Sequence, residues 1–458
     1  MIPGGHAVTA PSITPTALLS VVGTDARVPL VDGGETRYTN LDYAASAPAL
    51  ATVAEHVGEV LASYASVHRG AGYLSRVCTA LYEDARAAVT SFVGARGDDV
   101  VVFTRHTTDA FGLLASATPG EAVLLDIEHH ANLLPWQRRG DRVLAARPTL
   151  AATLDALEAE LRRRPAALVT VTGASNVTGE RTPLPTIADI AHRHGARLAV
   201  DGAQLAPHRP IDLAGTGVDY LAFSGHKLYA PYGAGVLVGR RDWLDAAEPY
   251  LAGGGAVTDV TVAATAWAPA PARHEAGTPN VVGVAALARA CRELAALPAG
   301  ALVDHEHHLR ERLVDGLAAL GITPLRLWPD SPGAVGLVAF TVDGVPAGKV
   351  AAYLSAEHGI GVRDGRFCAH PLLDRLGVPA AVRASFGVGS TVEDVDRLLS
   401  ALGALSARGT QWAYAQDSAG WAPVPETRRL PDWLGGAPLS GEQRPCDGPV
   451  PVSPPGIP

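Results

Sequence analysis

Between residues 97 and 240, short apolar runs alternate with longer segments in which apolar positions recur with helical spacing. Short apolar runs are typical of buried strands, and the periodic segments are typical of amphipathic helices. This alternation predicts an α/β fold with a mostly parallel sheet that is covered by helices on both faces. The predicted strands are Val100–Phe103, Val123–Leu125, Ala167–Val171, Leu198–Val200 and Tyr220–Phe223, and the predicted helices are Thr153–Arg164 and Pro185–His194.

The pattern changes beyond about residue 300, where longer helices separate fewer strands. The sequence Ser390-Thr391-Val392-Glu393 has the spacing of a capping box, so it predicts the start of a helix that runs to about Leu405. We expect a smaller α+β domain here. Its other predicted elements are helices at Leu302–Leu320 and Ala347–His358 and strands at Leu337–Thr341 and Val382–Phe386.

The two ends of the chain lack this periodicity. The N-terminal segment is rich in small residues and proline, and we interpret it as an extension. The C-terminal segment is rich in proline, glycine and tryptophan. We interpret it as a tail that either lies on the surface through Trp412, Trp421 and Trp433 or is disordered. The four predicted parts are the extension (1–36), a large domain (37–300), a small domain (301–408) and the tail (409–458).

The composition is that of a globular protein, since 47% of the 458 residues are hydrophobic and 18% are charged. The formal net charge is −9 and no basic block stands out, so we expect neither nucleic acid nor an anionic membrane as a partner. No apolar run reaches the roughly 20 residues of a membrane span. The first lysine or arginine is Arg27, which argues against a secretory signal. The four cysteines form no C-x-x-C pair, which argues against a zinc site or disulfide framework and favours a reducing cytoplasm.

Two chemically informative residues follow neighbouring predicted strands. Asp201 opens Asp-Gly-Ala-Gln, and Lys227 closes Ser-Gly-His-Lys 26 residues later. Ligands of parallel sheets bind at the carboxyl ends of strands, where both residues fall. This pair fits pyridoxal 5′-phosphate (PLP), because the carboxylate keeps the pyridine nitrogen protonated and the amine forms a Schiff base with the aldehyde. Either residue alone would be an ordinary loop residue, but Gln204, Ser224 and His226 beside them favour the cofactor site.

Further motifs occur in order along the chain. In addition to the two tetrapeptides, they are Leu41–Ser46, Val67–Gly70, Thr107–Asp109, Glu128–Asn132, Ser175–Gly179, Glu275–Asn280, Arg363–Pro371 and Arg383–Ser385. Each motif alone is a weak signal. As an ordered set over about Leu41–Leu405, they resemble the fold-type I PLP enzymes of the class V aminotransferase superfamily. Within it, the chain is most similar to group II cysteine desulfurases and selenocysteine lyases.

The resemblance implies roles for residues around the cofactor. Lys227 would form the Schiff base and then move protons at the substrate α-carbon. Gln204 and Asn176 would bind the ring hydroxyl, although Asn176 in Asn-Val-Thr-Gly also fits a turn. His129 would stack on the ring and act as an acid–base group, with His130 as the adjacent alternative.

The cofactor phosphate needs N–H and hydroxyl donors. Thr107 and Thr108 precede an apolar helical pattern, so we expect them at a helix N-terminus, where free amides and the helix dipole favour an anion. Simple N-capping would use the same residues. Ser224 and His226 match further phosphate donors of the family. Thr278 matches a residue that the family contributes from a second subunit, which implies a homodimer.

The last two motifs supply an arginine clamp and a thiol. Arg383 matches the arginine that binds the substrate carboxylate bidentately, with a structural ion pair as the alternative. Arg363 is expected to bind substrate or to order the loop before the cysteine. Cys368 matches the cysteine that takes sulfur from the substrate, with a small buried apolar residue as the alternative. Arg366 is close enough in sequence to lower the pKa of this thiol.

The resemblance implies a cytoplasmic, homodimeric PLP enzyme that acts on L-cysteine or L-selenocysteine. It would release L-alanine and pass sulfur, as a persulfide on Cys368, to an acceptor protein or a small thiol.

Departures from the family pattern beside the cysteine leave other reactions open. Arg366 and Phe367 stand where the family commonly has two histidines, and His370 stands where it commonly has glutamine. One alternative is therefore another class V PLP enzyme, such as a C–S lyase, an epimerase or a specialised biosynthetic enzyme. A second alternative is a non-catalytic PLP-binding or sulfur-carrier scaffold, although the retained lysine, aspartate and arginine disfavour it.

Overall fold

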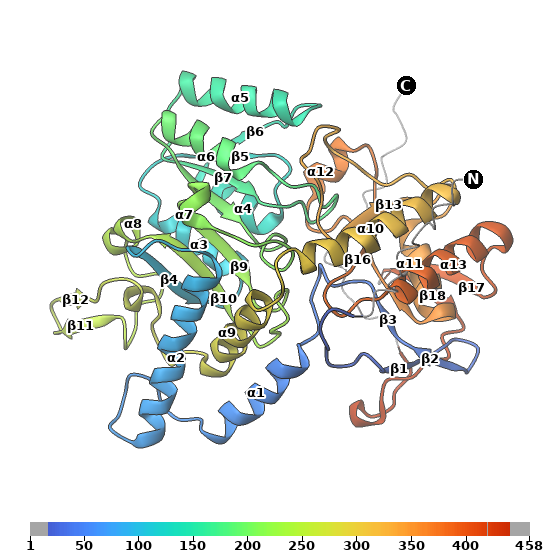
Figure 1. The fold of residues 1–458 in the computed structure, drawn as a ribbon, viewed down its shortest axis with the longest axis horizontal. Coiled ribbons are helices and arrows are strands. Elements are labelled where there is room, and N and C mark those ends of the chain that lie inside the picture. Colours follow the sequence, from blue (N-terminus) through green and yellow to red (C-terminus); the bar gives the residue numbers. More distant parts are fainter. Residues whose placement is uncertain (1–16, 419, 440–458) are drawn as a thin grey trace, which may run out of the picture.

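The computed structural model describes residues 17–418 and 420–439, and its largest element is a seven-stranded sheet (Figure 1). The strand order is β4-β10-β9-β8-β7-β5-β6. These strands are β4 (Asp99–Thr104), β5 (Ala122–Leu125), β6 (Arg142–Leu144), β7 (Leu168–Thr172), β8 (Arg197–Asp201), β9 (Tyr220–Ser224) and β10 (Gly235–Arg240). Neighbouring strands pair in parallel, except that β10 is antiparallel to β4 and β9. The mostly parallel sheet predicted from the sequence is confirmed.

Side chains along each strand alternate between the two faces of the sheet, as the two-residue period of a strand requires. In β4, Val101 and Phe103 belong to one buried cluster, whereas Val100 and Val102 belong to another. The same division occurs in five other strands, whose buried side chains belong partly to one cluster and partly to the other: β5, β7, β8, β9 and β10. Because both faces bury apolar side chains, these strands are continuous apolar runs in the sequence.

Helices cover both faces of the sheet, as the sequence predicts. On one face α2 packs against α9, which also contacts α1, and on the other face α3 contacts α4 and α8. These helices are α1 (Ala51–Ala62), α2 (Tyr73–Phe92), α3 (Thr107–Ala117), α4 (His130–Arg139), α5 (Leu150–Arg163), α6 (Leu184–Arg193), α7 (Leu213–Thr216), α8 (Arg241–Ala246) and α9 (Val281–Ala295). Among the helices in the described part of the chain, none combines the length and apolar character needed to cross a bilayer.

Residues beyond 300 form a smaller α+β unit, which occupies the right half of Figure 1. An antiparallel sheet in the order β13-β16-β15 packs against α10 and α11 around a separate apolar core. The elements are α10 (Ala301–Ala319), β13 (Leu337–Phe340), α11 (Ala347–His358), β15 (Arg363–Gly365), α12 (His370–Arg375), β16 (Ala381–Ser385) and α13 (Val392–Arg408).

The capping box before α13 lies one residue beyond its predicted position. Thr391 is the N-cap: its hydroxyl accepts the Asp394 N–H, and the Asp394 carboxylate accepts the Thr391 N–H. The hydroxyl of Ser390 instead accepts the N–H of Gly387 and turns the chain before the helix. The predicted Ser390 cap is therefore wrong, because two overlapping tetrapeptides had suitable spacing and only one has the required backbone geometry.

Short strands near the N-terminus lie against the smaller unit. β1 (Arg27–Pro29) and β2 (Glu35–Arg37) form a hairpin, and β3 (Thr39–Asn40) pairs in parallel with β14 (Ile360–Gly361). Figure 1 shows this blue hairpin below α11 and α13. The first 16 residues of the predicted extension lie outside the described residues.

A second hairpin follows α13 and packs on α11. It consists of β17 (Ala413–Asp417) and β18 (Gly420–Val424). Glu357 of α11 accepts the backbone N–H of Trp412 at 3.2 Å, so the start of this segment is tied to the helix. Trp433 further along is 81% exposed. The predicted tail beyond residue 439 lies outside the described residues.

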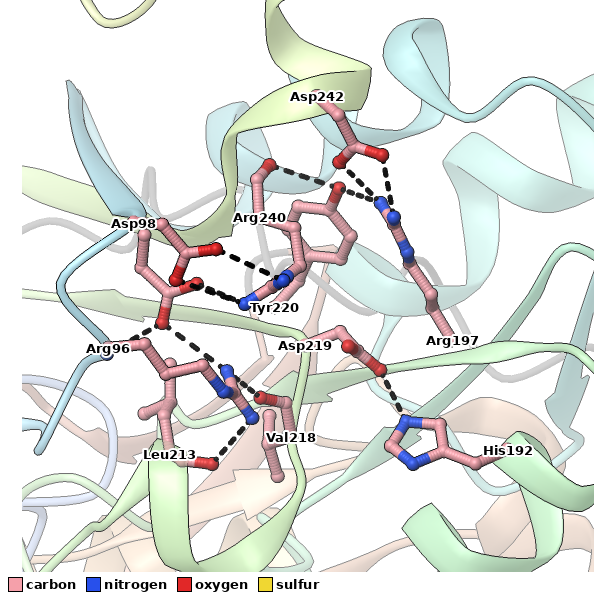
Figure 2. Close-up of polar contacts among 11 residues, drawn as sticks. Arg96, Asp98, His192, Arg197, Leu213, Val218, Asp219, Tyr220, Arg240 and Asp242 are labelled. Atoms are coloured by element: carbon pink, nitrogen blue, oxygen red, sulfur yellow. Dashed lines mark hydrogen bonds and ion pairs between the residues drawn. The ribbon is translucent and has the colours of Figure 1, made fainter.

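Charged residues join the strands at the sheet edge where β8 and β9 begin (Figure 2). Arg197 donates to the two carboxylate oxygens of Asp242 at 2.8 and 2.6 Å and to the Tyr220 hydroxyl at 3.0 Å. Asp219 contacts the His192 ring nitrogen at 2.8 Å. Because ligands of parallel sheets bind at the carboxyl ends of strands, this network at the amino ends belongs to the stability of the fold.

Candidate active site

The carboxyl ends of four adjacent strands carry residues singled out in the sequence. In sheet order, His129 follows β5, Asn176 follows β7, Asp201 ends β8, and Lys227 lies in the turn after β9. Because these strands are parallel, their carboxyl ends meet at one edge of the sheet. The fold thus gathers side chains that are far apart in the sequence.

Asp201 is buried at the end of β8, where its Oδ1 accepts the Ala203 N–H at 2.9 Å. Burial raises the pKa of Asp201, whereas this N–H and the charge of Lys227 act in the opposite direction. The neighbouring Gly202 has no room for a side chain, since a Cβ there would lie 2.6 Å from the Leu221 side chain. A buried carboxyl group of this kind becomes an anion most readily when a cation is placed against it.

The Lys227 amine lies among charged groups from both units of the chain. Burial lowers the pKa of Lys227 to about 8, against the raising effect of Asp201. Arg383 and Arg363 also lower this pKa, whereas Cys368 raises it. Because such effects weaken with distance, they couple the amine to residues of both the large sheet and the smaller unit. Near neutral pH this lysine therefore has a larger free-amine fraction than an ordinary lysine, which favours nucleophilic attack.

His129 and His130 have different surroundings. His129 is the N-cap of α4, and its Nδ1 accepts a backbone N–H at 3.0 Å, so the ring proton is on Nε2. Burial, followed by the charge of Lys227, lowers the pKa of His129 to about 3. The ring of His130 instead lies 4.6 Å from that of His370, and its backbone N–H donates to the Cys368 carbonyl at 2.8 Å. His129 is thus coupled to the lysine, whereas His130 contacts the Cys368 turn and His370.

Gln204 and Asn176 are both buried, and their side-chain amides differ in their hydrogen bonds. Gln204 Nε2 donates to the Ala44 carbonyl at 2.7 Å, but its Oε1 is buried without a hydrogen-bond partner among the described residues. Asn176 Nδ2 donates to the Phe367 carbonyl at 2.8 Å. A buried amide oxygen without a partner is unfavourable, so Gln204 is a candidate to receive a donor from a ligand.

Thr107 and Ser224 form a candidate anion site. The N–H and hydroxyl of Thr107, the first residue of α3, contact the Ser224 hydroxyl at 2.8 and 2.7 Å. Both residues are buried, whereas Thr108 is exposed. Burial, followed by the charge of Lys227, lowers the pKa of His226 to about 4, so this ring is neutral at pH 7. Two hydroxyls and a helix N-terminus provide the donors that an anion requires.

Arg383 of β16 is buried and stands opposite Arg363 of β15. Its Nη1 donates to the Asn176 carbonyl at 2.8 Å and its Nη2 to Asp42 Oδ1 at 3.0 Å, while Nε is buried without a partner among the described residues. The structural ion pair considered as an alternative is therefore present. Because a guanidinium has five N–H donors, these contacts leave donors for a ligand. Asp42 belongs to the motif Leu41–Ser46, but the sequence does not predict its contact with Arg383.

Cys368 lies in a turn with unusual backbone geometry. Phe367 and Cys368 have φ angles of 54° and 53°, a region that residues other than glycine rarely adopt. Contacts hold the turn in place: the Phe367 carbonyl accepts from Asn176, and the Cys368 carbonyl accepts from His130. The Arg383 guanidinium lies 5.3 Å from the centre of the Phe367 ring. Strain of this kind persists where surrounding contacts enforce it, and it is common at functional sites.

Arg366 anchors this turn to α12. It donates to the His370 carbonyl at 2.9 Å and pairs with Asp374. Its effect on the pKa of Cys368 stays a prediction.

Thr278 is exposed and lies in the motif Glu275–Asn280. Glu275 anchors this motif to the large sheet, since its carboxylate accepts the Phe103 N–H at 2.7 Å and two Arg86 donors at 3.0 and 2.9 Å. The sequence singles out this motif, but it does not predict the contacts of Glu275 with Phe103 and Arg86. The predicted contact of Thr278 with a second subunit stays a prediction.

The aminotransferase class-V family matches residues 39–398 of the chain. A relative from Mycobacterium leprae named probable cysteine desulfurase 2 is 36% identical over 409 residues, which cover 85% of this chain and 96% of the relative. A probable cysteine desulfurase from Halobacterium salinarum is 38% identical and covers 81% of this chain and 92% of the relative.

Solved structures of cysteine desulfurases share the fold. The apo enzyme from Thermococcus onnurineus NA1 has a TM-score of 0.75 at 32% identity, covering 85% of this chain and 99% of its own. Escherichia coli CsdA in its S-sulfonic acid form has a TM-score of 0.70 at 35% identity, covering 80% and 94%. The family match over residues 39–398 spans the large sheet and reaches α13 of the smaller unit. The chain therefore belongs to the aminotransferase class-V family, a family of PLP-dependent enzymes.

Proposed function

We propose that this enzyme is a PLP-dependent cysteine desulfurase, which removes sulfur from L-cysteine, or selenium from L-selenocysteine, and releases L-alanine. The observation that carries the proposal is that Asn176, at the carboxyl end of β7, contacts both Arg383 and the turn that holds Cys368. Both residues thereby lie at the sheet edge that carries Lys227, and both affect its pKa. The reaction needs a lysine for the cofactor, an arginine for the substrate carboxylate and a thiol for the sulfur.

The described residues fit the polar groups of PLP. Lys227 would hold the aldehyde, Asp201 the ring nitrogen, Gln204 the ring hydroxyl, and Thr107 with Ser224 the phosphate. Two observations support this fit: Gln204 Oε1 is buried without a partner among the described residues, and the two hydroxyls are buried together at a helix N-terminus. When bound, PLP withdraws electrons from the bonds at the substrate α-carbon.

Arg383 and Arg363 would bind the substrate carboxylate between them. Arg383 is already oriented by Asp42 and the Asn176 carbonyl, and its buried Nε has no partner among the described residues. A guanidinium held in this way loses little conformational freedom when it binds a carboxylate.

Lys227 would move the proton at the substrate α-carbon. With a pKa of about 8, its protonated and free forms are both accessible near neutral pH, which suits a group that must both accept and release a proton. His129 is uncharged in the same range and can donate from Nε2.

Cys368 would receive the sulfur. Its thiolate sulfur forms a bond with the substrate sulfur as the substrate C–S bond breaks, and the carbon that loses sulfur gains a proton. L-cysteine and the Cys368 thiol thereby become L-alanine and a Cys368 persulfide, with no other oxidant or reductant. The contacts of the turn at Phe367 and His130 support this role because they fix the backbone on both sides of the sulfur.

The remaining parts of the proposal concern partners and location. A homodimer is supported by the exposed Thr278 and by Arg69, which donates to the carbonyls of Gly254 and Gly277 and so ties a second loop to the same region. That loop leads to Tyr73, which is 79% exposed. The persulfide would pass to an acceptor protein or a small thiol in the cytoplasm, where Cys368 stays reduced.

A C–S lyase is the second candidate, favoured by the sequence departures at Arg366, Phe367 and His370. Product analysis separates the two reactions when PLP-loaded protein is mixed with L-cysteine and a reductant. Equal amounts of alanine and sulfide support the desulfurase, whereas pyruvate with ammonia and sulfide supports the lyase. Absence of any product while PLP stays bound would contradict both and favour a non-catalytic scaffold. The same assay with L-selenocysteine measures the preference for sulfur or selenium.

A further inference from the structure

Glu128 is a buried acid beside the candidate site. It directly precedes His129 after β5, and its side chain is completely buried. Its Oε2 accepts Asn132 Nδ2 at 2.7 Å, whereas Oε1 is buried without a hydrogen-bond partner among the described residues. An ionised carboxylate with one buried, unsatisfied oxygen is costly, and the neutral acid avoids most of that cost.

The neighbours of Asn132 determine which oxygen of Glu128 would carry a proton. Asn132 Oδ1 receives Trp136 Nε1 at 3.1 Å and Thr170 Oγ1 at 2.7 Å. An indole N–H can only donate, so this side of the Asn132 amide must be its oxygen. The amide nitrogen therefore faces Glu128 and donates to Oε2. A proton on this carboxyl group accordingly belongs on Oε1.

Two other acids affect the charge of Glu128. Asp126 lies two residues before it, and Asp201 ends β8, where it is in register with Thr172 of the intervening β7. Burial raises the pKa of Glu128 to about 8. This value includes the lowering effects of Asn132 and the Thr172 N–H and the raising effects of Asp201 and Asp126.

We propose that Glu128 is a positioning residue that stays protonated, so that Asp201 alone, and not a pair of carboxylates, faces the cofactor ring. The role toward the ring rests on the proposed function, whereas the neutral state does not. Two ionised carboxylates in this space would repel each other. His129, the titratable neighbour from α4, is uncharged near neutral pH. Through Asn132, the neutral acid also holds the first turn of α4, whose N-cap is His129.

The first test compares the cofactor-free wild type with Glu128→Gln, in which an amide replaces the neutral acid. A carboxyl group whose pKa rises from 4.5 to about 8 on folding destabilises the folded state increasingly over that pH range, because the unfolded chain releases its proton more readily. The melting temperature of the wild type should therefore fall relative to that of Glu128→Gln between about pH 5 and pH 8, and the difference should then level off. Glu55→Gln, at an exposed position of α1, is the matched control and should show no such trend.

Infrared spectroscopy gives a direct readout of the proton. At pH 7 the wild type should show the carbonyl band of a protonated carboxylic acid, and Glu128→Gln should lack it. In PLP-loaded protein, Glu128→Ala should lower kcat/KM for cysteine about tenfold or more, and Glu128→Gln should restore most of that loss.

Parallel pH trends in wild type and Glu128→Gln would overturn the proposal, as would a Glu128→Gln enzyme as inactive as Glu128→Ala. If the pH trend and the infrared band occur but no variant, including the wild type, produces alanine, the neutral acid stands and the proposed function fails.

Discussion

Arg363 and Arg383 stand directly opposite each other in the antiparallel pair β15–β16. Like charges at opposed positions on one face of a sheet are destabilising. The pKa of Arg383 lies below its ordinary value mainly because of burial, with Asp42 opposing this effect and Arg363 adding to it. An anion bound between the two guanidinium groups would replace this repulsion with attraction.

Replacing Arg363 should therefore affect stability and binding in opposite directions. We expect Arg363→Ala to raise the free energy of unfolding of the cofactor-free protein by up to about 1 kcal/mol, because a cross-strand repulsion is removed. The same variant should raise KM for cysteine about tenfold with a smaller change in kcat. Chemical denaturation and steady-state kinetics measure the two effects. Arg312→Ala, which removes an exposed pair with Asp396, should leave KM unchanged. An unaltered KM in Arg363→Ala would count against the clamp.

The lowered pKa of Lys227 predicts how fast cofactor-free protein takes up PLP. Only the free amine attacks an aldehyde, so the uptake rate should rise with pH and level off above about 8. Stopped-flow absorbance measures this rate. A rate that continues to rise to about pH 10, as for an ordinary lysine, would contradict the account. Lys227→Ala should bind PLP only reversibly, so gel filtration should remove the cofactor from that variant but not from the wild type.

Substitution of the adjacent histidines separates their roles. His129→Ala should lower kcat about a hundredfold, the usual contribution of an acid–base group, while His130→Ala should change it less than about threefold. Because the pKa of His129 is about 3, its ionisation should not change kcat/KM between about pH 5 and pH 7. Steady-state kinetics over this range checks both statements. A larger loss in His130→Ala would reverse the assignment.

Loss of the Glu275 charge should destabilise the fold. Its carboxylate is buried, pairs with Arg86 and also accepts the Tyr82 hydroxyl at 3.0 Å. Removal of one partner from a buried ion pair leaves an uncompensated charge, so Glu275→Gln should lower the free energy of unfolding by about 3 kcal/mol. Urea denaturation measures this loss. Asp242→Asn, at a carboxylate 60% exposed, should cost less than about 1 kcal/mol. Equal losses in the two variants would contradict this explanation.

The central sheet and the approach of Asp201 to Lys227 could be predicted because buried parallel strands are continuous apolar runs. Both residues directly follow such runs, and adjacent parallel strands end at the same edge. The direction of β10 was not predicted. Only residues 225–234 separate it from β9, which is too few for the crossover that a parallel strand needs, so the chain turns back as a hairpin.

Other features depend on tertiary contacts that no local pattern contains. Strands β3 and β14 have two residues each and pair across more than 300 positions, so neither shows a periodic pattern. Asp42 belongs to a recognised motif, but its contact with Arg383, 341 positions away, follows from the folded chain. The left-handed backbone at Cys368 is likewise enforced by distant partners and not by its own sequence.

The most direct test of the central claim is mass analysis of the Cys368 peptide after PLP-loaded protein has reacted with one equivalent of L-cysteine without reductant. The account predicts one added sulfur atom on Cys368 and an equal amount of alanine, with both lost in Cys368→Ala while PLP stays bound. Alanine formation by Cys368→Ala at the wild-type rate, or sulfur carried by another cysteine, would contradict the account.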